Sequence, residues 1–533
     1  MDSTTTNSQC CPFSIRLWPP SEGSRRVLVE RLRNKLTTNS IFTQKYGCLS
    51  KEEAEESAQQ IEDLAFNTAS QLYDRGPDGD GGAAVQLYAK ECSKLLLEVL
   101  KRGPAAKNDK VLASKQATSP AETFSDISKG QRAFIEAEEA KNILRPLKEP
   151  GNSYTKICFG NRSSGLGAAR VAEPILVSLK NQLKEVDLSD FIAGRGEAGA
   201  LEVIKIFSAA LEGSVLKSLD LSNNYALGEK GVGASGALLK SQSSLEELYL
   251  MNVGISEDAA KAVCELIPST ENLRVLKFHN NMTGDKGALA ISEVVKHSPL
   301  LEDFRCSSTR VDSEGGIALS NALETCSHLK KLDLRDNVFG AEAGVGLSKS
   351  LFKHANLVGV YLSYLNLEDE GAIAVANALK ESAPSLEVLE MAGNDITGDA
   401  APALAACIAS KQHLTKLNLS ENELKGEGPS QIGRALEGLA QLKEVDMSNN
   451  SMRRAGARML AQVVIEKPGF KLLNIDGNII SNEGVDEVKK YSRNFLTSLG
   501  LWMRMISKEE MTVRNLEKDK VKAKLMGMGW RLN

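Results

Sequence analysis

The sequence predicts an α/β solenoid, a parallel sheet with helices outside it, preceded by a small all-α bundle. The first observation is the pattern LxxLxLxxN, which returns at a nearly constant spacing from Leu245 onward, as at Leu273, Leu301 and Leu329. The second is the amphipathic stretch after each copy, such as AIAVANALK, with small and aliphatic residues at helical spacing. The third is that residues 1–104 lack this pattern. A chain of 533 residues is long for one core, which also favours a repeat array beside a second domain.

Residues 1–104 are predicted to form a bundle of three amphipathic helices. Ser50 and Glu53 make a capping box that begins the second helix, and AAVQLYAKECSKLLLEVLKR is the third. The first helix is recognised by three leucines that share one face: Leu28, Leu32 and Leu36. Three helices of this length are enough for a small separate domain.

The stretch Trp18, Pro19 and Pro20 precedes the first helix, where prolines can stop the helix from starting earlier. Two interpretations stay open from the pattern alone. Trp18 either packs on the bundle beside a proline stop, or the three residues form a rigid amphipathic anchor for a partner.

The rest of the chain divides into four predicted segments. Residues 105–123 are rich in Ala and Lys and are predicted to be a linker. Residues 124–153 are expected to form a helical cap, which a solenoid needs at its end. About twelve leucine-rich repeats fill residues 154–490, and residues 491–533 form a basic tail.

In each repeat the LxL segment is expected to be a strand, and the asparagine closes the turn after it by bonding to the backbone. No repeat can bury its own apolar stripe, so the repeats must stack. The regular repeat length, with a full helix per repeat, resembles the ribonuclease-inhibitor-like horseshoe. Five repeats have another residue in place of the turn asparagine: Arg162, Phe191, Val253, Thr309 and Leu365. These departures indicate either that the rim has another function or that the repeat sequences have drifted in the ordinary way.

Composition excludes several classes of function. No apolar run approaches the roughly 20 residues that span a bilayer, and the N-terminus lacks the basic and apolar start of a secretory signal. Nine scattered cysteines without CxxC pairs favour a reducing compartment, although Cys10 and Cys11 could be lipidated. Five histidines without ligand spacing argue against a metal site, and no nucleotide-binding or catalytic-triad motif is present, so no cofactor is expected.

The charge is distributed unevenly along the chain. The net charge is −4, yet residues 489–533 hold 11 basic and 4 acidic residues, so the repeats carry the negative charge. An acidic body argues against a nucleic-acid partner and favours a basic protein surface. The middle residues of the LxL strands agree, since this column is polar and largely acidic with tyrosines, from Asp187 and Asp220 to Asn474.

One repeat is longer than the others. The step from Leu183 to Leu216 exceeds the step from Leu245 to Leu273, and the insertion contains Ile-Ala-Gly-Arg-Gly with Arg195 between its two glycines. The extra residues are expected just after the strand, at the rim, where they could project Arg195 toward a partner. A tolerated surface insertion is the alternative.

The segment LSDFIAGR resembles the second repeat of Ran GTPase-activating proteins, and LEELYLMNVGISEDAAKAV resembles that family's LYLxNNGLG segment. The resemblance covers the repeats from Tyr154 to about 490. It implies that Arg195 and Asn252 are the catalytic residues of a GTPase activator, although Val253 replaces the second asparagine of the motif. In this family the asparagine is understood to orient the glutamine of the GTPase, and the arginine to act at the interface instead of on the phosphates.

The same resemblance implies further contacts and the partner. The expected partner is Ran in its GTP-bound state, and the chain would be an activator with no nucleotide site of its own. Four residues directly before the turn position are candidates for GTPase binding: Asp190, Asn223, Asn280 and Asp336.

The N-terminal segment resembles the plant WPP domain, which is named after Trp-Pro-Pro and is carried by plant Ran GTPase-activating proteins. The resemblance implies that Trp18, Pro19 and Pro20 target the chain to the nuclear envelope through coiled-coil anchor proteins, without membrane insertion. The expected locations are the cytoplasm and outer nuclear envelope, with the cell plate or spindle in mitosis. The basic tail departs from the acidic end usual in the family.

A different class of function remains as the alternative. A non-catalytic leucine-rich-repeat scaffold, ribonuclease-inhibitor-like or immune-receptor-like, would share the repeats. The Gly-Arg insertion and the WPP-like segment favour the activator.

Overall fold

The computed structural model describes residues 18–37, 49–75, 82–102, 124–127, 133–225, 227–465, 467–499 and 502–504. The chain divides into two compact units, Met1–Ser119 and Pro120–Asn533. The hypotheses on Cys10 and Cys11, on the linker 105–123 and on most of the basic tail fall outside the described residues. None of the described helices is long and apolar enough to cross a membrane.

The first unit contains the three predicted helices, α1 (Glu22–Thr37), α3 (Lys51–Arg75) and α4 (Gly82–Arg102). The capping box is confirmed, because the Ser50 N–H donates to Glu53 at 3.1 Å and the Glu53 N–H donates to Ser50 Oγ at 3.2 Å. The bundle has its own apolar core, separate from that of the repeats. It therefore has the packing of an independent domain.

A buried carboxylate ties the three helices together. Glu62 on α3 is 1% exposed in its side chain and accepts two hydrogen bonds of 2.7 Å from Arg25 on α1. The Tyr88 hydroxyl on α4 also donates to Glu62. Burial raises the pKa of Glu62, but the bonds from Arg25 and Tyr88 outweigh it, so the pKa is lowered and the group stays charged.

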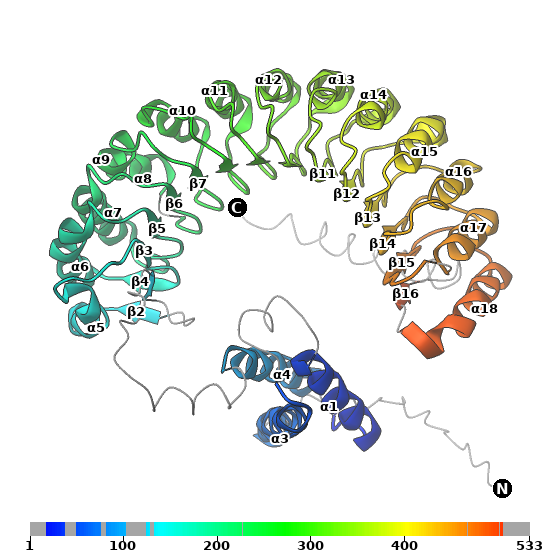
Figure 1. Cartoon of the computed structure of the whole chain (residues 1–533), viewed down its shortest axis with the longest axis horizontal. Coiled ribbons are helices and arrows are strands. Elements are labelled where there is room, and N and C mark those ends of the chain that lie inside the picture. Colours follow the sequence, from blue (N-terminus) through cyan, green and yellow to red (C-terminus); the bar gives the residue numbers. More distant parts are fainter. Residues whose placement is uncertain are drawn as a thin grey trace, which may run out of the picture. The chain divides into compact units, whose positions relative to one another are not determined.

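The second unit is a curved parallel sheet with helices along its outer side (Figure 1). Its strands pair in sequence order: β1 (Phe124–Asp126), β3 (Lys156–Cys158), β5 (Glu185–Asp187), β6 (Ser218–Asp220), β7 (Glu247–Tyr249), β8 (Val275–Lys277), β9 (Asp303–Arg305), β10 (Lys331–Asp333), β11 (Gly359–Tyr361), β12 (Val388–Glu390), β13 (Lys416–Asn418), β14 (Glu444–Asp446), β15 (Leu472–Asn474) and β16 (Trp502–Arg504). The α/β solenoid predicted from the repeats is confirmed.

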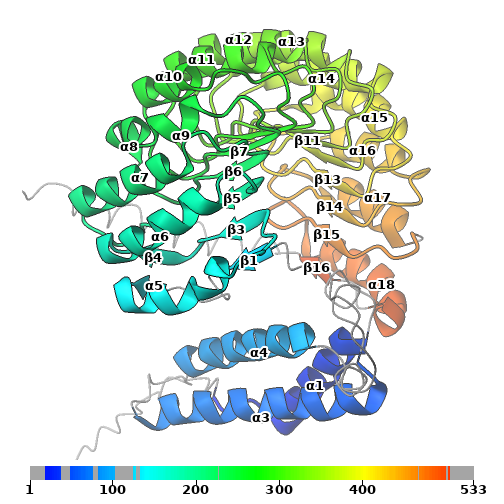
Figure 2. The same cartoon turned by 60° about the vertical axis from the view of Figure 1, so that its left-hand side comes forward.

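The helices lie outside the strands along the whole arc, and Figure 2 shows this from a second side for the first repeats. They are α5 (Ala137–Ile143), α6 (Leu166–Leu179), α7 (Glu197–Leu211), α8 (Gly228–Ala234), α9 (Gly236–Lys240), α10 (Glu257–Leu266), α11 (Gly284–Lys296), α12 (Ser313–Leu323), α13 (Gly340–Leu351), α14 (Glu368–Glu381), α15 (Ala401–Ala409), α16 (Gly428–Ala435), α17 (Arg454–Ile465) and α18 (Asn482–Leu499). Two short 3-10 turns, Arg145–Lys148 and Gly398–Ala400, complete the unit.

The turn asparagines bond to the backbone of their turns as predicted, and they also join neighbouring repeats. Asn394 is fully buried, and its Nδ2 donates to the Leu362 carbonyl of the preceding repeat at 2.8 Å. Its Oδ1 accepts from the Leu365 and Leu367 N–H groups at 2.9 and 3.3 Å. One buried amide thus satisfies backbone groups that no strand or helix can pair.

The side chains that replace this asparagine are buried, so they do not themselves form a surface on the rim. Phe191, Val253 and Leu365 are at most 1% exposed and fill the core, and Phe191 packs on Phe207 with ring centroids 5.1 Å apart. Thr309 is buried and its Oγ1 donates to the Cys306 carbonyl. At these positions the hydrogen-bonding amide of asparagine is replaced by an apolar side chain that packs in the core, or by a smaller side chain with a hydroxyl.

Both ends of the array differ from the prediction. The cap at 124–153 is not wholly helical, because β1 pairs with β3 as the first strand of the sheet and β2 (Ala133–Ile135) pairs with β4 (Arg162–Ser164). At the other end the array continues past residue 490, since α18 runs to Leu499 and β16 pairs with β15. A strand at the edge of a sheet has backbone N–H and C=O groups without partners. Here β1 pairs with the outer side of β3, and β16 pairs with the outer side of β15.

Replacing one turn asparagine tests the role of these amides. Asn394→Ala leaves two N–H groups and a carbonyl unpaired in the core and is expected to lower the free energy of unfolding by about 2–4 kcal/mol. Asn377→Ala, on the exposed face of α14, is the matched control and should change it by less than about 0.5 kcal/mol. Urea unfolding followed by circular dichroism measures both, and equal stabilities would contradict the assigned role.

Candidate functional site

Five of the site residues predicted from the sequence share one backbone position. Each directly precedes the turn position and has a positive φ: 55° at Asp190, 62° at Asn223, 61° at Asn252, 54° at Asn280 and 57° at Asp336. Asparagine and aspartate adopt this left-handed conformation more readily than other side chains. The position lies at the carboxyl ends of the strands, and we call this edge of the solenoid the rim.

The backbone of the rim is fixed by bonds to the following repeat. The Asn223 N–H donates to the Met251 carbonyl and the Asn252 N–H to the His279 carbonyl, both at 2.8 Å. The Asn280 N–H donates to the Ser307 carbonyl at 2.9 Å. The three asparagines therefore follow one another at the spacing of neighbouring strands.

Their side chains also form a chain of amides, which we call the rim ladder: Asn223, Asn252 and Asn280. Asn280 Nδ2 donates to Asn252 Oδ1 at 2.6 Å, and Asn252 Nδ2 donates to Asn223 Oδ1 at 3.1 Å. Asn223 and Asn280 are exposed and Asn252 is half-buried. The structure thus places two of the four candidate GTPase-binding residues in contact with the candidate catalytic asparagine.

The other two candidates lie apart from the ladder. Asp190 occupies the rim one repeat before Asn223 but is only 8% exposed. Asp336 is exposed, and Ser308 separates it from Asn280 by one repeat. A partner surface that covered all of them would extend along the rim from the repeat of Asp190 to that of Asp336.

Arg195 does not project from its loop, which corrects the expectation from its glycine neighbours. Its side chain is 20% exposed and turns back onto the cap and the first repeat. Nη1 lies 2.5 Å from Glu136 Oε1, and Nη2 donates to the Ser163 carbonyl at 2.7 Å. The guanidinium also stacks 4.8 Å from the centre of the Phe134 ring.

The insertion itself is shared between the loop and the helix after it. Helix α7 has 15 residues and α11 has 13, so only part of the extra length extends the helix. Gly194 has a φ of 74°, and a Cβ there would approach Phe134 to 3.1 Å. The glycine therefore allows the turn that places Arg195 against the cap. The loop thus holds the arginine against the protein instead of extending it toward a partner.

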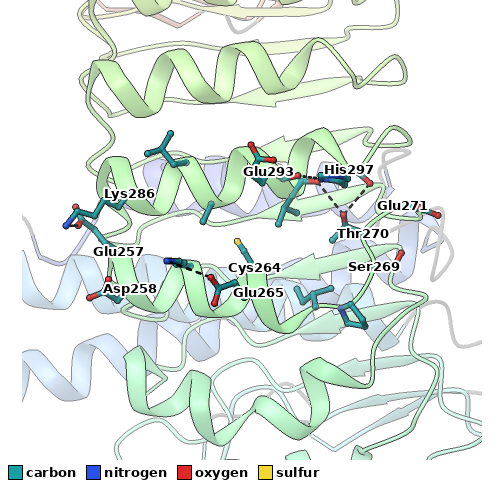
Figure 3. Close-up of a pocket in the computed structure, with 16 residues that line it drawn as sticks. Glu257, Asp258, Cys264, Glu265, Ser269, Thr270, Glu271, Lys286, Glu293 and His297 are labelled. Carbon is teal, nitrogen blue, oxygen red and sulfur yellow. Dashed lines mark hydrogen bonds and ion pairs between the residues drawn. The ribbon is translucent and has the colours of Figure 1, made fainter.

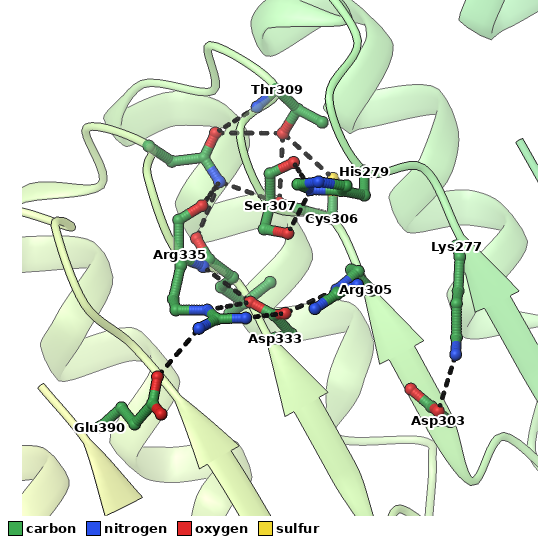
Figure 4. A network of polar contacts seen from close by, with 12 residues as sticks. Lys277, His279, Asp303, Arg305, Cys306, Ser307, Thr309, Asp333, Arg335 and Glu390 are labelled. Carbon is green, nitrogen blue, oxygen red and sulfur yellow. Dashed lines mark hydrogen bonds and ion pairs between the residues drawn. The ribbon is translucent and has the colours of Figure 1, made fainter. Parts of the chain in front are cut away.

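The concave face, formed by the inward side chains of the sheet, carries the predicted polar column in register. The third residues of successive strands pair directly, from Asp187 and Asp220 through Tyr249 to Asn474. The centre of this face is an ion-pair network in which Asp333 lies 2.6 Å from Arg305 and 2.8 Å from Arg335 (Figure 4). The basic side chains at the centre are thus neutralised within the face.

His279 lies close to both the rim ladder and Arg305 of this network. The His279 carbonyl accepts from the Asn252 N–H, and its ring Nδ1 lies 2.9 Å from Ser307 Oγ. Burial and then the nearby Arg305 lower the pKa of His279, so the ring is neutral at pH 7. A neutral ring adds no charge beside Asn252.

The first half of the concave face is acidic. Asp187 and Asp220 are paired across β5 and β6, and burial together with the Asp187 carboxylate raises the pKa of Asp220. Ser222 partly offsets this shift by donating its backbone N–H to Asp220 at 2.8 Å. A basic partner surface would relieve the repulsion between the two carboxylates.

A separate groove lies on the outer side of the array, between α10 and α11 (Figure 3). It has a volume of about 770 Å³ and mixes acidic side chains such as Glu265 and Glu293 with Lys261 and His297. Burial raises the pKa of its Cys264 thiol to about 12, so the thiol is not a nucleophile at neutral pH. In the described parts of the chain no group of three or more His, Cys, Asp or Glu could hold a metal ion.

Comparison with known proteins identifies the family to which the chain belongs. The chain is 69% identical over 490 residues to RAN GTPase-activating protein 2 of Arabidopsis thaliana, a match that covers 92% of this chain and 90% of the relative. RAN GTPase-activating protein 1 of the same plant is 64% identical over 499 residues, covering 94% and 92%. The chain belongs to the Ran GTPase-activating protein family. The alternative of an unrelated leucine-rich-repeat scaffold is thereby set aside.

The two units of this Ran GTPase-activating protein family member match separate domain descriptions. Residues 14–110 match the WPP domain, and residues 325–348, 382–405 and 410–430 match leucine-rich repeats. MFP1 attachment factor 1 of Solanum lycopersicum is 34% identical over 137 residues, covering 25% of this chain and 84% of that protein. The predicted WPP-like segment is confirmed as a WPP domain.

The WPP domain takes its tryptophan into the core. Trp18 is 3% exposed and packs on Phe66 and Tyr88, with ring centroids 5.2 and 5.5 Å apart. Pro19 is exposed and Pro20 half-buried. The packing interpretation of Trp18 is therefore confirmed, and the targeting role of the three residues stays a prediction.

Sequence reasoning missed the residues that hold Arg195 and the contacts that hold Asn252. Glu136, Ser163 and Phe134 contact Arg195 across a separation of 32 to 61 positions, and no spacing rule connects them. The ladder had a visible signal, because Asn223 and Asn280 stand 29 and 28 positions from Asn252 and were already candidates. Their contact with Asn252, and its direction, had no signal in the sequence.

Removing the Arg195 side chain tests whether it closes the cap. Arg195→Ala is expected to lower the free energy of unfolding by about 1–2 kcal/mol, because it leaves the buried Ser163 carbonyl without its charged donor. Amide hydrogen exchange should accelerate in residues 133–136 and 162–164. Lys205→Ala, on the exposed side of α7, is the control. Unchanged protection of these segments in Arg195→Ala would show that the arginine is not a cap residue.

Proposed function

We propose that this chain accelerates GTP hydrolysis on Ran and that Asn252 is the side chain that acts on the reaction. One observation carries the assignment to Asn252: its amide stands on the rim in a backbone fixed by His279 and between two amides that hold it in place. Family membership supports the activity, since both close relatives are named as activators of Ran.

The chemistry follows from what an amide can do without a charge. In small GTPases a glutamine of the GTPase positions the attacking water, and a correctly placed group from an activator lowers the barrier. The Asn252 amide can donate to and accept from such a glutamine and so hold it in the reactive orientation. The fixed rim means that little reorganisation is needed when the partner docks. The nucleotide and its metal ion would both belong to Ran, and the chain contributes no nucleotide site.

Arg195 has a supporting part in this proposal. Its guanidinium is engaged with Glu136, Ser163 and Phe134, which supports a role in shaping the cap beside the rim and not a role on the phosphates. The acidic pair Asp187 and Asp220 on the concave face supports docking of the GTP-bound partner through a basic surface. Candidates Asp190 and Asp336 would then contact Ran on either side of the ladder.

The first unit is proposed to determine where in the cell the chain is located. The WPP domain, which this chain shares with a protein named as an attachment factor, supports association with the nuclear envelope through coiled-coil anchor proteins. Since Trp18 is a core residue, its contribution to targeting would come through the fold of the bundle, with Pro19 at the surface. Cytoplasmic residence, and the cell plate or spindle in mitosis, complete the proposed locations.

Replacing Asn252 tests the assignment without straining the backbone. Asn252→Gly removes the amide, and glycine adopts a φ of 61° at no steric cost. The single-turnover rate of Ran GTP hydrolysis at saturating activator is expected to fall by about a hundredfold, the effect of one oriented group. Asn449→Gly, an exposed rim asparagine with a φ of 53°, is the matched control. A wild-type rate in folded Asn252→Gly would remove the asparagine from the mechanism.

Deleting the first unit separates location from activity. A chain without residues 1–119 keeps the whole repeat core and should activate Ran in solution at the full-length rate. In cells, its fluorescent fusion should no longer line the nuclear envelope, whereas the full-length fusion should. A truncated chain that still lines the envelope would refute targeting by the WPP domain.

A further inference from the structure

The two neighbours of Asn252 in the rim ladder contact it with opposite chemistry. Asn280 Nδ2 donates to Asn252 Oδ1 at 2.6 Å, whereas Asn252 Nδ2 donates to Asn223 Oδ1 at 3.1 Å. Toward Asn252, therefore, Asn280 is a donor and Asn223 is an acceptor. The ladder has a direction along the rim, from the repeat of Asn280 to that of Asn223.

The direction of the ladder determines where the oxygen of the Asn252 amide lies, on the side of Asn280 or on the side of Asn223. A primary amide has nearly the same shape after a half-turn, so packing alone does not distinguish its two ends. If Asn252 turned alone, its NH₂ group would face the NH₂ group of Asn280, and its oxygen would face the oxygen of Asn223. Both contacts would be repulsive, so Asn252 cannot turn while Asn223 and Asn280 keep their orientations.

The ladder also leaves a defined set of hydrogen-bonding groups for a partner. An asparagine side chain has two N–H donors and two oxygen lone pairs. Asn280 occupies one lone pair of Asn252, and Asn223 takes one of its N–H groups. One donor and one acceptor remain, which is the complement of a side-chain amide.

We propose that Asn223 and Asn280 are positioning residues that fix the orientation of the Asn252 amide, so that it meets a side-chain amide of the docked GTPase with its donor and acceptor in set places. The proposal rests on the proposed function and specifies how its central side chain is prepared. It also assigns Asn223 and Asn280 a task other than direct contact with Ran. The run of asparagines ends at Asn280, because Ser308 occupies the rim in the next repeat.

The backbone of the ladder offers a way to test its direction. Aspartate tolerates the left-handed conformation as asparagine does, so it preserves the rim while it turns the amide into an acceptor without donors. Asn223→Asp keeps the acceptor that Asn252 requires, but Asn280→Asp removes the donor and sets a carboxylate against Asn252 Oδ1. Both variants place the same charge beside Asn252, so each is a control for the charge of the other.

The experiment measures multiple-turnover hydrolysis over a range of concentrations of GTP-bound Ran with a catalytic amount of the full chain, giving kcat and KM for each variant. Asn280→Asp should lower kcat about tenfold or more, the effect of losing one oriented bond, whereas Asn223→Asp should lower it less than about threefold. Asn280→Gly removes the donor without adding a charge and should also lower kcat. Asn449→Asp, at the same rim position in a distant repeat, should behave as the unchanged chain.

Three results would overturn the proposal: equal losses in the two aspartate variants, a larger loss in Asn223→Asp, or a full kcat in Asn280→Gly. Losses confined to KM would likewise overturn it, since they would mean that the two residues only bind Ran. Failure of the proposed function has a different signature, because the unchanged chain would then not accelerate hydrolysis, or Asn252→Gly would not slow it.

Discussion

The amide of each turn asparagine bonds two successive repeats, and the position of the rim depends on this bond. Asn281, for example, donates to the Leu250 carbonyl of the preceding repeat at 2.7 Å, and its Oδ1 accepts from the Val253 and Ile255 N–H groups. These bonds fix where the strand ends and the chain reverses. The residue directly before the turn is thereby held in the left-handed conformation, and at Asn252 that residue is the candidate catalytic side chain.

A solenoid with a continuous rim suits a member of the Ran GTPase-activating protein family. Its concave face neutralises its own basic residues, as in the contacts of Arg335 with Asp333 and Glu390, and leaves the carboxylates Asp187 and Asp220 near the start of the array. Above this face the rim presents neutral amides. Charge can therefore direct a basic partner to the sheet, while the proposed catalytic amide has a fixed place and no charge of its own.

The repeats made most of the fold predictable. The regular return of the leucine pattern located the strands, the outer helices and the turn asparagines, because each repeat can bury its apolar side only against its neighbours. The ends were harder, since β1 and β16 pair with the sheet although neither segment shows the leucine pattern. Sequence motifs were enough to select Asn252 and Trp18 as candidate functional residues. The burial of Trp18 and the inward turn of Arg195 depend on contacts between distant segments, such as Phe66 and Glu136, which local spacing does not reveal.

The central claim is that Asn252 acts through the glutamine of the bound GTPase, and a double-mutant cycle tests this most directly. Asn252→Gly and a substitution of that glutamine in Ran are combined, and single-turnover hydrolysis is measured at saturating activator for the four pairs. If the two side chains act as a unit, the second substitution costs little once the first is made. Independent losses that multiply in the doubly substituted pair would contradict the account.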